Sequence, residues 1–143
     1  MSVQSALVAY LKTVSAVTTL VGSGANARIR PFERLQGEAL PAITYFVVDG
    51  RVDGMWSGTP ALTRSRVQID CWSGLHTESI ALLAAIRAAT DGFAGTFAST
   101  PISGARIAEI REEFERASLG GAGGTTDTKW FRQSIDWIVW HAG

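Results

Sequence analysis

The chain has 143 residues, of which 46% are hydrophobic and 18% charged, and its 13 basic and 13 acidic residues balance to zero net charge. This composition is typical of one globular domain that buries its own core, and it excludes a disordered chain or a protein drawn to nucleic acid by its overall charge. The longest apolar run, residues 80–86, is far shorter than the roughly 20 residues that span a bilayer. The N-terminus lacks a basic leader, so we expect no secretory signal.

The N-terminal part of the chain predicts a helix and two strands. Apolar residues at spacings of three and four predict one helix from Ser2 to about Val21. Ile29-Arg30-Pro31 suits a short edge strand, where proline is tolerated. Residues 42–49, apolar on almost both faces, predict a central strand. Residues 50–60 are rich in glycine and predict a loop or a long hairpin arm that carries Met55 and Trp56.

The segment from Leu62 to Thr90 predicts a strand followed by a helix. Ser65, Val67, Ile69 and Cys71 alternate with Arg64, Arg66, Gln68 and Asp70, so the first set is expected to face the core and the second to face outward. The only cysteine of the chain is then a small buried hydrophobe, and a disulfide within one chain is excluded. Apolar residues at positions 80, 83, 86 and 89, widened by position 82, predict the inner face of the helix. Asp91-Gly92 ends that helix.

The C-terminal part predicts three more strands. They are a short strand at 95–98, a strand at 105–115 that is exposed on one side or lies at an edge, and a long strand at 129–141. Residues 101–104 are expected to form a turn, and the glycine-rich residues 118–128 a flexible linker. In the last strand, Phe131, Ile135, Trp137 and Val139 face the core, while Arg132, Ser134 and Asp136 face outward.

These elements predict a single α+β domain over residues 1–143. Short connections favour a mainly antiparallel sheet of about four to six strands, with two helices packed on one face. Flexible loops are expected at about 50–60 and 118–128.

The sequence holds no catalytic motif and no zinc-ligand spacing, so we expect no enzyme activity, cofactor or metal. Asp70, Glu109 and Asp136 lie on strands that could bring them together around a magnesium ion. Arg66 and Arg132 are expected on the same outward faces, and ion pairing between strands is the simpler explanation. Both readings remain open at this point.

The outward faces of the two long strands suggest a surface for protein contacts. They combine Arg64, Arg66, Asp70, Arg132 and Asp136 with Trp72 and Trp140 at the strand ends. Arginine and tryptophan are enriched at protein interfaces, where complementary charges fix the register. The same pattern also suits an ordinary solvated face of a sheet. Met55 and Trp56 either fold back onto the domain or await a partner.

Several segments resemble the tail completion (tail terminator, head-to-tail joining) proteins of long-tailed bacteriophages. They are SALVAYLKTVSAVTTLVG at the start, PAITYFVVDGR, RSRVQIDCWS with the following helix that ends IRAATDGF, and RQSIDWIVWH at the end. The similarity spans nearly the whole chain. It implies a small α+β subunit of a hexameric ring that caps the tail tube, stops tube polymerisation and docks to the head connector, with DNA passing through the lumen. The glycine-rich insert at 118–128 and the long 50–60 loop depart from the family pattern.

The expected function is therefore that of a virion structural protein. The resemblance implies the tail tube protein and a head completion or connector protein as partners, DNA passing without sequence-specific binding, and no membrane. The location implied is the tail–head junction of the virion, with assembly in the host cytoplasm. The interface residues we expect are Met55, Trp56, Arg64, Arg66, Asp70, Arg132 and Asp136. The alternatives are a small metal-dependent hydrolase or nuclease and a monomeric ligand-binding module.

Overall fold

The computed structural model describes residues 3–33, 39–53, 62–97, 100–118 and 127–142. Within these residues, six strands form one sheet in the order β1-β2-β3-β6-β5-β4. The strands are β1 (Ile29–Pro31), β2 (Ala42–Asp53), β3 (Leu62–Ser73), β4 (Gly95–Phe97), β5 (Thr100–Ser118) and β6 (Asp127–Ala142). β1 runs parallel to β2, and all the other neighbouring pairs in this sheet are antiparallel.

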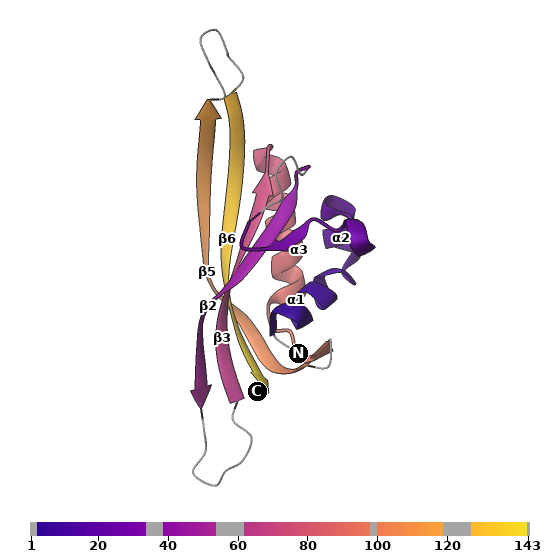
Figure 1. Cartoon of the computed structure of the whole chain (residues 1–143), viewed down its shortest axis with the longest axis vertical. Coiled ribbons are helices and arrows are strands. Elements are labelled where there is room, and N and C mark those ends of the chain that lie inside the picture. The colour runs from indigo at the N-terminus through magenta and orange to yellow at the C-terminus, as the bar shows by residue number, and fades with distance from the viewer. Residues whose placement is uncertain (1–2, 34–38, 54–61, 98–99, 119–126, 143) are drawn as a thin grey trace.

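The helices lie on one face of the sheet (Figure 1). They are α1 (Val3–Leu11), α2 (Ser15–Val21) and α3 (His76–Thr90), with a short 3-10 helix at Gly24–Asn26. The predicted α+β class, with a mainly antiparallel sheet, is therefore confirmed. Among the residues described, no helix is long and apolar enough to cross a membrane.

The four long strands form two hairpins that extend beyond the helices at opposite ends of the molecule (Figure 1). β2 and β3 pair as far as Asp53 and Leu62, which lie at one end. β5 and β6 pair as far as Ser118 and Asp127, which lie at the other end. β3 pairs with β6 in the middle of the sheet and joins the two hairpins.

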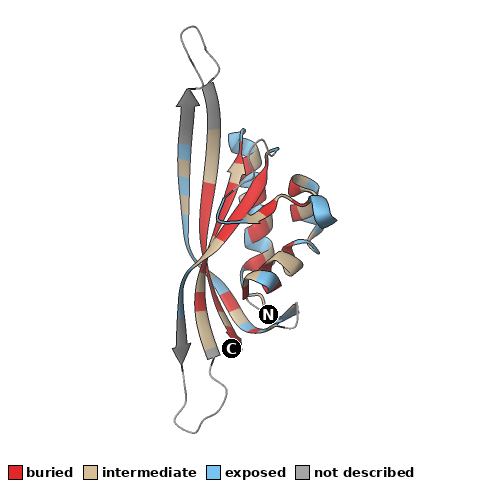
Figure 2. Cartoon of the chain, viewed as in Figure 1, coloured by how far each residue is buried: buried red, intermediate tan, exposed pale blue. Residues whose placement is uncertain are grey.

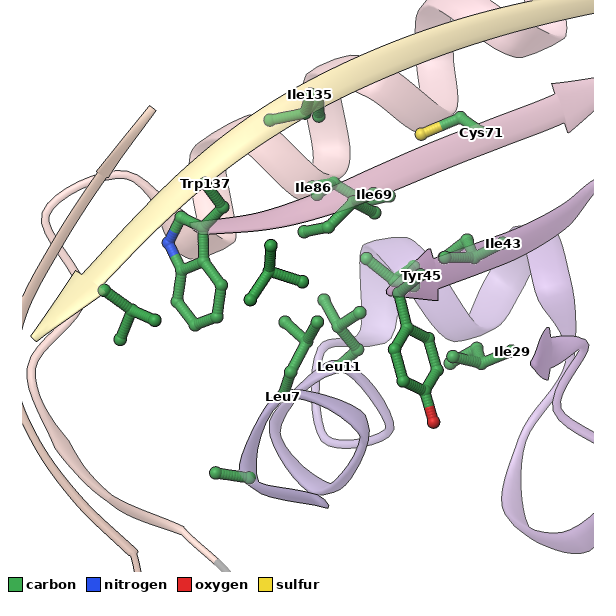
Figure 3. Close-up of a cluster of buried hydrophobic side chains, with 14 of the residues drawn as sticks. Leu7, Leu11, Ile29, Ile43, Tyr45, Ile69, Cys71, Ile86, Ile135 and Trp137 are labelled. Atoms are coloured by element: carbon green, nitrogen blue, oxygen red, sulfur yellow. The ribbon is translucent and has the colours of Figure 1, made fainter. Parts of the chain in front are cut away.

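The core lies between the helices and the two central strands, β3 and β6 (Figures 2 and 3). The strands contribute the inward residues that the alternation predicted: Val67, Ile69, Cys71, Ile135, Trp137 and Val139. The helices contribute Leu7, Leu11, Leu82 and Ile86, all fully buried. The expectation for Cys71 is confirmed, because its thiol is buried and unpaired. Its pKa is raised far above the ordinary value, first by burial and then by the nearby Asp70 charge.

The prediction of one helix from Ser2 to Val21 is wrong. α1 ends at Leu11, Val14 is extended with φ −88° and ψ 109°, and α2 begins at the next residue. Local chemistry favours the break, because Thr13 Oγ1 donates a hydrogen bond to the Tyr10 carbonyl at 2.6 Å. Threonine and valine also lose side-chain freedom inside a helix. The break redirects α2 so that its valines reach the core.

α3 begins and ends where the sequence predicted, but its buried face is rotated. Ser79, Leu82, Ile86 and Thr90 are buried, whereas Ile80 is 44% exposed. The periodicity identified the helix correctly, but it could not show that a serine and a threonine would take inward positions. Gly92 follows the helix with φ 76°, as expected of a glycine that ends a helix.

Strand β5 is longer and less regular than predicted. The turn expected at 101–104 is wrong, because these residues belong to β5. A bulge between Ile107 and Glu109 then changes the face of the strand. Ile107 lies opposite Trp137 on the helix side, and Glu109 lies opposite Asp136 on the other side, although their spacing of two in the sequence would place them on one face. The expected edge position is confirmed, since β4 pairs only with residues 100–102.

The remaining strand predictions hold in part. The strands at 29–31 and 129–141 are confirmed, and the short strand predicted at 95–98 is β4. β2 has a described neighbour on both sides only at Ile43–Tyr45, so only that part is central. The loop predicted at 50–60 begins later than expected, because residues 50–53 belong to β2. Likewise, residues 118, 127 and 128 of the predicted linker belong to strands. Met55 and Trp56 lie outside the described residues.

Candidate functional site

The candidate site is the face of the sheet opposite the helices, which we call the charged face. β3 contributes Arg66, Gln68, Asp70 and Trp72, β6 contributes Arg132, Ser134 and Asp136, and β5 contributes Glu109, Arg111 and Glu113. Within the described ranges, no helix or strand covers this face (Figure 1). The face is therefore a surface of paired charges on three neighbouring strands of the sheet.

Asp136 lies at the centre of the charged face. Its side chain is only 1% exposed, although no described element lies over the sheet at this position, because two arginine side chains cover it. Arg66 forms an ion pair with the carboxylate from β3. Arg111 binds it from β5 through both oxygens, at 3.1 and 3.3 Å. Two-point binding of this kind is the strongest arginine–carboxylate geometry.

These contacts set the protonation state of Asp136. Burial alone would raise the pKa of Asp136, but the hydrogen bonds donated by Arg111 and Arg66 outweigh burial and hold its pKa below the ordinary value. The pKa values of both arginines are raised, chiefly through the same hydrogen bonds. The three groups therefore all remain charged at neutral pH.

Glu109 extends this network toward the edge of the sheet. Its carboxylate lies 3.3 Å from Arg111 and 3.9 Å from Arg66, and its side chain is 52% exposed. Surface ion pairs of this kind contribute little stability, about 0.2–1 kcal/mol each. Glu109 is thus the part of the network that remains most available to another molecule.

A chain of hydrogen bonds through the neutral side chain of Gln68 connects the network to Asp70. Arg111 Nη2 donates to Gln68 Oε1 at 3.3 Å, and Gln68 Nε2 donates to Asp70 at 3.0 Å. Ser134 Oγ donates to the same carboxylate at 2.6 Å. Asp70 is 4% exposed, so its charge is stabilised by hydrogen bonds rather than by water.

Arg132 forms a second cluster at the upper end of the charged face. Arg132 makes an ion pair with Glu113 of β5 and lies over the ring of Trp72, with 5.1 Å between the guanidinium carbon and the ring centroid. Trp72 Nε1 donates to Thr44 Oγ1 at 2.9 Å, which fixes the ring. A cation over a fixed indole is a cation–π contact that holds the arginine in place.

Four of the predicted interface residues take part in the contacts described above. Arg66, Asp70, Arg132 and Asp136 all lie on the charged face, as predicted from the alternation. Arg64 lies on the same face beside Trp140, one row below. No contact joins it to the network in the described part of the chain. Met55 and Trp56 fall on residues that the structure does not describe.

Sequence reasoning missed Arg111 and Glu113 as parts of this face. The bulge near Glu109 explains the error, since one extra residue moves every later side chain of β5 to the opposite face. The signal that was available is the run of charges at 109–113. Glu109, Arg111 and Glu113 follow a period of two on the outward face, but Ile107, which precedes them at the same spacing, lies on the helix side because of the bulge.

The carboxylates of the charged face are already engaged. Asp136 is bound by two arginines and Asp70 by Gln68 and Ser134, so the cross-strand ion pairing weighed in the sequence is present. Among the described residues, no group of three or more His, Cys, Asp or Glu side chains is placed to hold a metal ion. The chemistry of this surface is charge complementarity.

Comparison with known proteins identifies the family. The model of the family described as "Tail completion protein gp17" matches residues 5–141, nearly the whole chain. The chain belongs to this family, and it is a structural protein of a bacteriophage tail. Among solved structures, a chain from the virion of a native gene transfer agent particle has the same fold, with a TM-score of 0.69 and 14% sequence identity. The match covers 99% of this chain and 96% of that chain. No curated protein matches.

Proposed function

We propose that this protein caps the phage tail tube as a ring, ends tail polymerisation and joins the tail to the head connector. The main observation in support is the pair of hairpins that extend beyond the helices at opposite ends of the molecule (Figure 1). A joining protein needs contacts in two opposite directions. With one hairpin at each end, a single subunit has one element for the tail tube protein and another for the head completion or connector protein.

The ring we propose is a hexamer located at the tail–head junction of the virion, assembled in the host cytoplasm. DNA passes through its lumen without sequence-specific binding, which is in keeping with the zero net charge of the chain. The protein acts without a cofactor, an enzymatic step or a membrane. A gene transfer agent particle, the source of the similar structure, is also a virion, and this supports a place in such a particle.

The charged face contributes contacts to a neighbouring subunit or to the tube. Its arginines and acids alternate across strands, so a partner with the complementary pattern is accepted in one register only. Arg64, Arg66, Asp70, Arg132 and Asp136 belong to this contact surface, together with the segment that carries Met55 and Trp56. A supporting feature is the partial exposure of Arg66, Arg111 and Glu109, whose side chains are 38%, 34% and 52% exposed.

The test is tube termination by purified protein. Tail tube protein of the same phage is polymerised with and without this protein, and tube lengths and tube ends are measured by electron microscopy. We expect a ring at one tube end and tubes that stop growing. Tubes that grow unchanged and carry no ring would contradict the proposal.

A charge exchange within the chain separates contact from folding. In the double variant Arg132→Glu with Glu113→Arg, the two residues keep opposite charges, while the sign that each position presents to a partner is reversed. We expect a folded protein with a small loss of thermal stability, because the cation–π contact between Arg132 and Trp72 is lost, but tubes that are not terminated. Normal termination by this well-folded variant would remove the upper end of the charged face from the contact surface.

A further inference from the structure

The large apolar side chains that are exposed in the described part of the chain gather at two opposite sides of the sheet. Phe32 and Val48 belong to the β1–β2 side, where the Phe32 ring stacks on Phe46 at 6.0 Å. Ile110 and Phe114 belong to β5 on the other side. Leu75 and Ile80 are also exposed, at the start of α3, where His76 contacts Glu112 of β5. Exposed apolar groups of this size commonly mark contact sites.

Each of these sides also has a long strand with an open edge. On β5, the pairing with the short strand β4 extends only from Thr100 to Ile102. Beyond it, the Ile107 N–H donates to Asp91 Oδ1, and the Gly92 N–H donates to the Ala105 carbonyl. No described strand pairs with the outer side of residues 108–118. On β2, β1 pairs only with residues 43–45, so residues 46–53 have no described neighbour on their outer side. Open edges of this length invite pairing with another strand.

The strand directions make these two edges complementary. β2, β3, β6 and β5 are neighbours in the sheet and alternate in direction. Because the number of alternating strands is even, the two edge strands run in opposite directions. Phe46 of β2 is level with Glu109 of β5, and the two open edges extend in opposite directions from that row. A second copy that is shifted along the strands would then place its β2 antiparallel to the β5 of the first copy, and a ring with such a shift closes when its strands are inclined to the ring axis, as in a barrel. Such a head-to-tail contact uses two different surfaces and can close into a ring.

We propose that the open edge of β2 (residues 46–53) in one copy pairs with the open edge of β5 (residues 108–118) in the next copy, which makes one continuous antiparallel sheet around the ring. This inference rests on the proposed ring and names its subunit contact. The pairing satisfies the backbone groups of both edges and places Val47, which lies on the helix side of β2, on the same side of the joined sheet as Ile110 and Phe114. It also explains why both edges are long and carry exposed apolar side chains, with no described strand beside them.

The decisive test is disulfide cross-linking between two different variants. Val47→Cys protein is mixed with Ile110→Cys, Glu112→Cys or Phe114→Cys protein, alone and on tube ends, and then oxidised; all four positions lie on the helix side of the sheet. Since Cys71 is fully buried, it does not compete. We expect cross-linked pairs in one of the three mixtures, because a disulfide forms only when the two Cα atoms lie about 4.4–6.8 Å apart. We expect none when each variant is oxidised alone.

The outcomes separate this inference from the proposed function. A multi-chain mass with no cross-link in any mixture would overturn the strand pairing and leave the ring standing. Cross-linking of Val47→Cys with itself would also overturn it, since that result requires a two-fold contact. A single-chain mass both alone and with tube protein would overturn the ring and the pairing together.

A point variant gives an independent readout. Phe114→Glu places a charge at the β5 edge on a side chain that is already exposed, so the fold should be retained. We expect at least about a tenfold loss of association. The matched control is Ala84→Glu, an exposed position of α3, which should associate like the wild type. Equal association of the two variants would argue against a contact at this edge.

Discussion

Asp136 is an ionised carboxylate with only 1% of its side chain exposed, held between two arginines that are each about one third exposed. Buried charges are costly when a partner is removed, because the remaining charge loses its compensation. If Asp136 is removed, Arg66 and Arg111 can turn toward water, which limits the loss of stability. The residue is therefore needed more for the geometry of the charged face than for a large share of the stability.

Replacing Asp136 with asparagine tests this estimate. We expect the free energy of unfolding at pH 7 to fall by about 1.5–3 kcal/mol, the range for hydrogen bonds to charged groups. The pKa of Asp136 is lowered in the folded protein. Its contribution is therefore present above the unfolded pKa of about 3.9 and is lost as the pH falls through the lower folded value. Urea unfolding between pH 3 and 7 measures both quantities.

The matched control for this experiment is Glu109→Gln, which removes a carboxylate from the same network at an exposed position. It should change stability by less than about 1 kcal/mol. If both variants lose the same stability, or if Asp136→Asn unfolds with the same acid dependence as the wild type, the central role of Asp136 in the network is wrong.

At the scale of elements, the end of α3 fixes how the helix meets the β5 edge. Gly92 has φ 76°, and its N–H donates to the Ala105 carbonyl at 3.0 Å. A Cβ added at Gly92 would meet no atom within 4 Å, so only backbone strain opposes a larger residue. We expect Gly92→Ala to cost about 1 kcal/mol.

Gly74 provides the comparison for that variant. A Cβ added there also meets no atom within 4 Å, but its φ is not positive. Thermal unfolding should show Gly74→Ala at or slightly above the wild-type stability. Equal destabilisation by both substitutions would mean that loss of glycine flexibility, rather than the left-handed conformation at Gly92, sets the cost.

The helices and strands also show which parts of the fold could be predicted from the sequence and which could not. Alternation predicted the inward and outward residues of β3 and β6 correctly, because a strand with one buried face leaves a period of two. It failed on β5, since the bulge at Glu109 adds one residue without a distinctive sequence signal. It failed again at Thr13–Val14, where local bonds end α1 although the apolar spacing continues. The charged face was thus predictable on two of its three strands, and Arg111 was missed with the third.

At the scale of the whole molecule, three kinds of surface meet in one small protein. The hairpins extend to opposite ends, the charged face lies opposite the helices, and two open edges run along the sides (Figure 1). Contacts at the ends suit stacking along an axis, and contacts at the edges suit repetition around it. Within the described residues, this arrangement is in keeping with the joining role that we propose.

The solution mass of the purified protein tests the central claim most directly. Light scattering behind a sizing column is measured over a range of concentrations, alone and with tail tube protein. We expect a stable species near six times the 15.3 kDa chain, either free or at tube ends. A mass of one chain under both conditions would contradict the ring, and the edges of β2 and β5 would then need another partner.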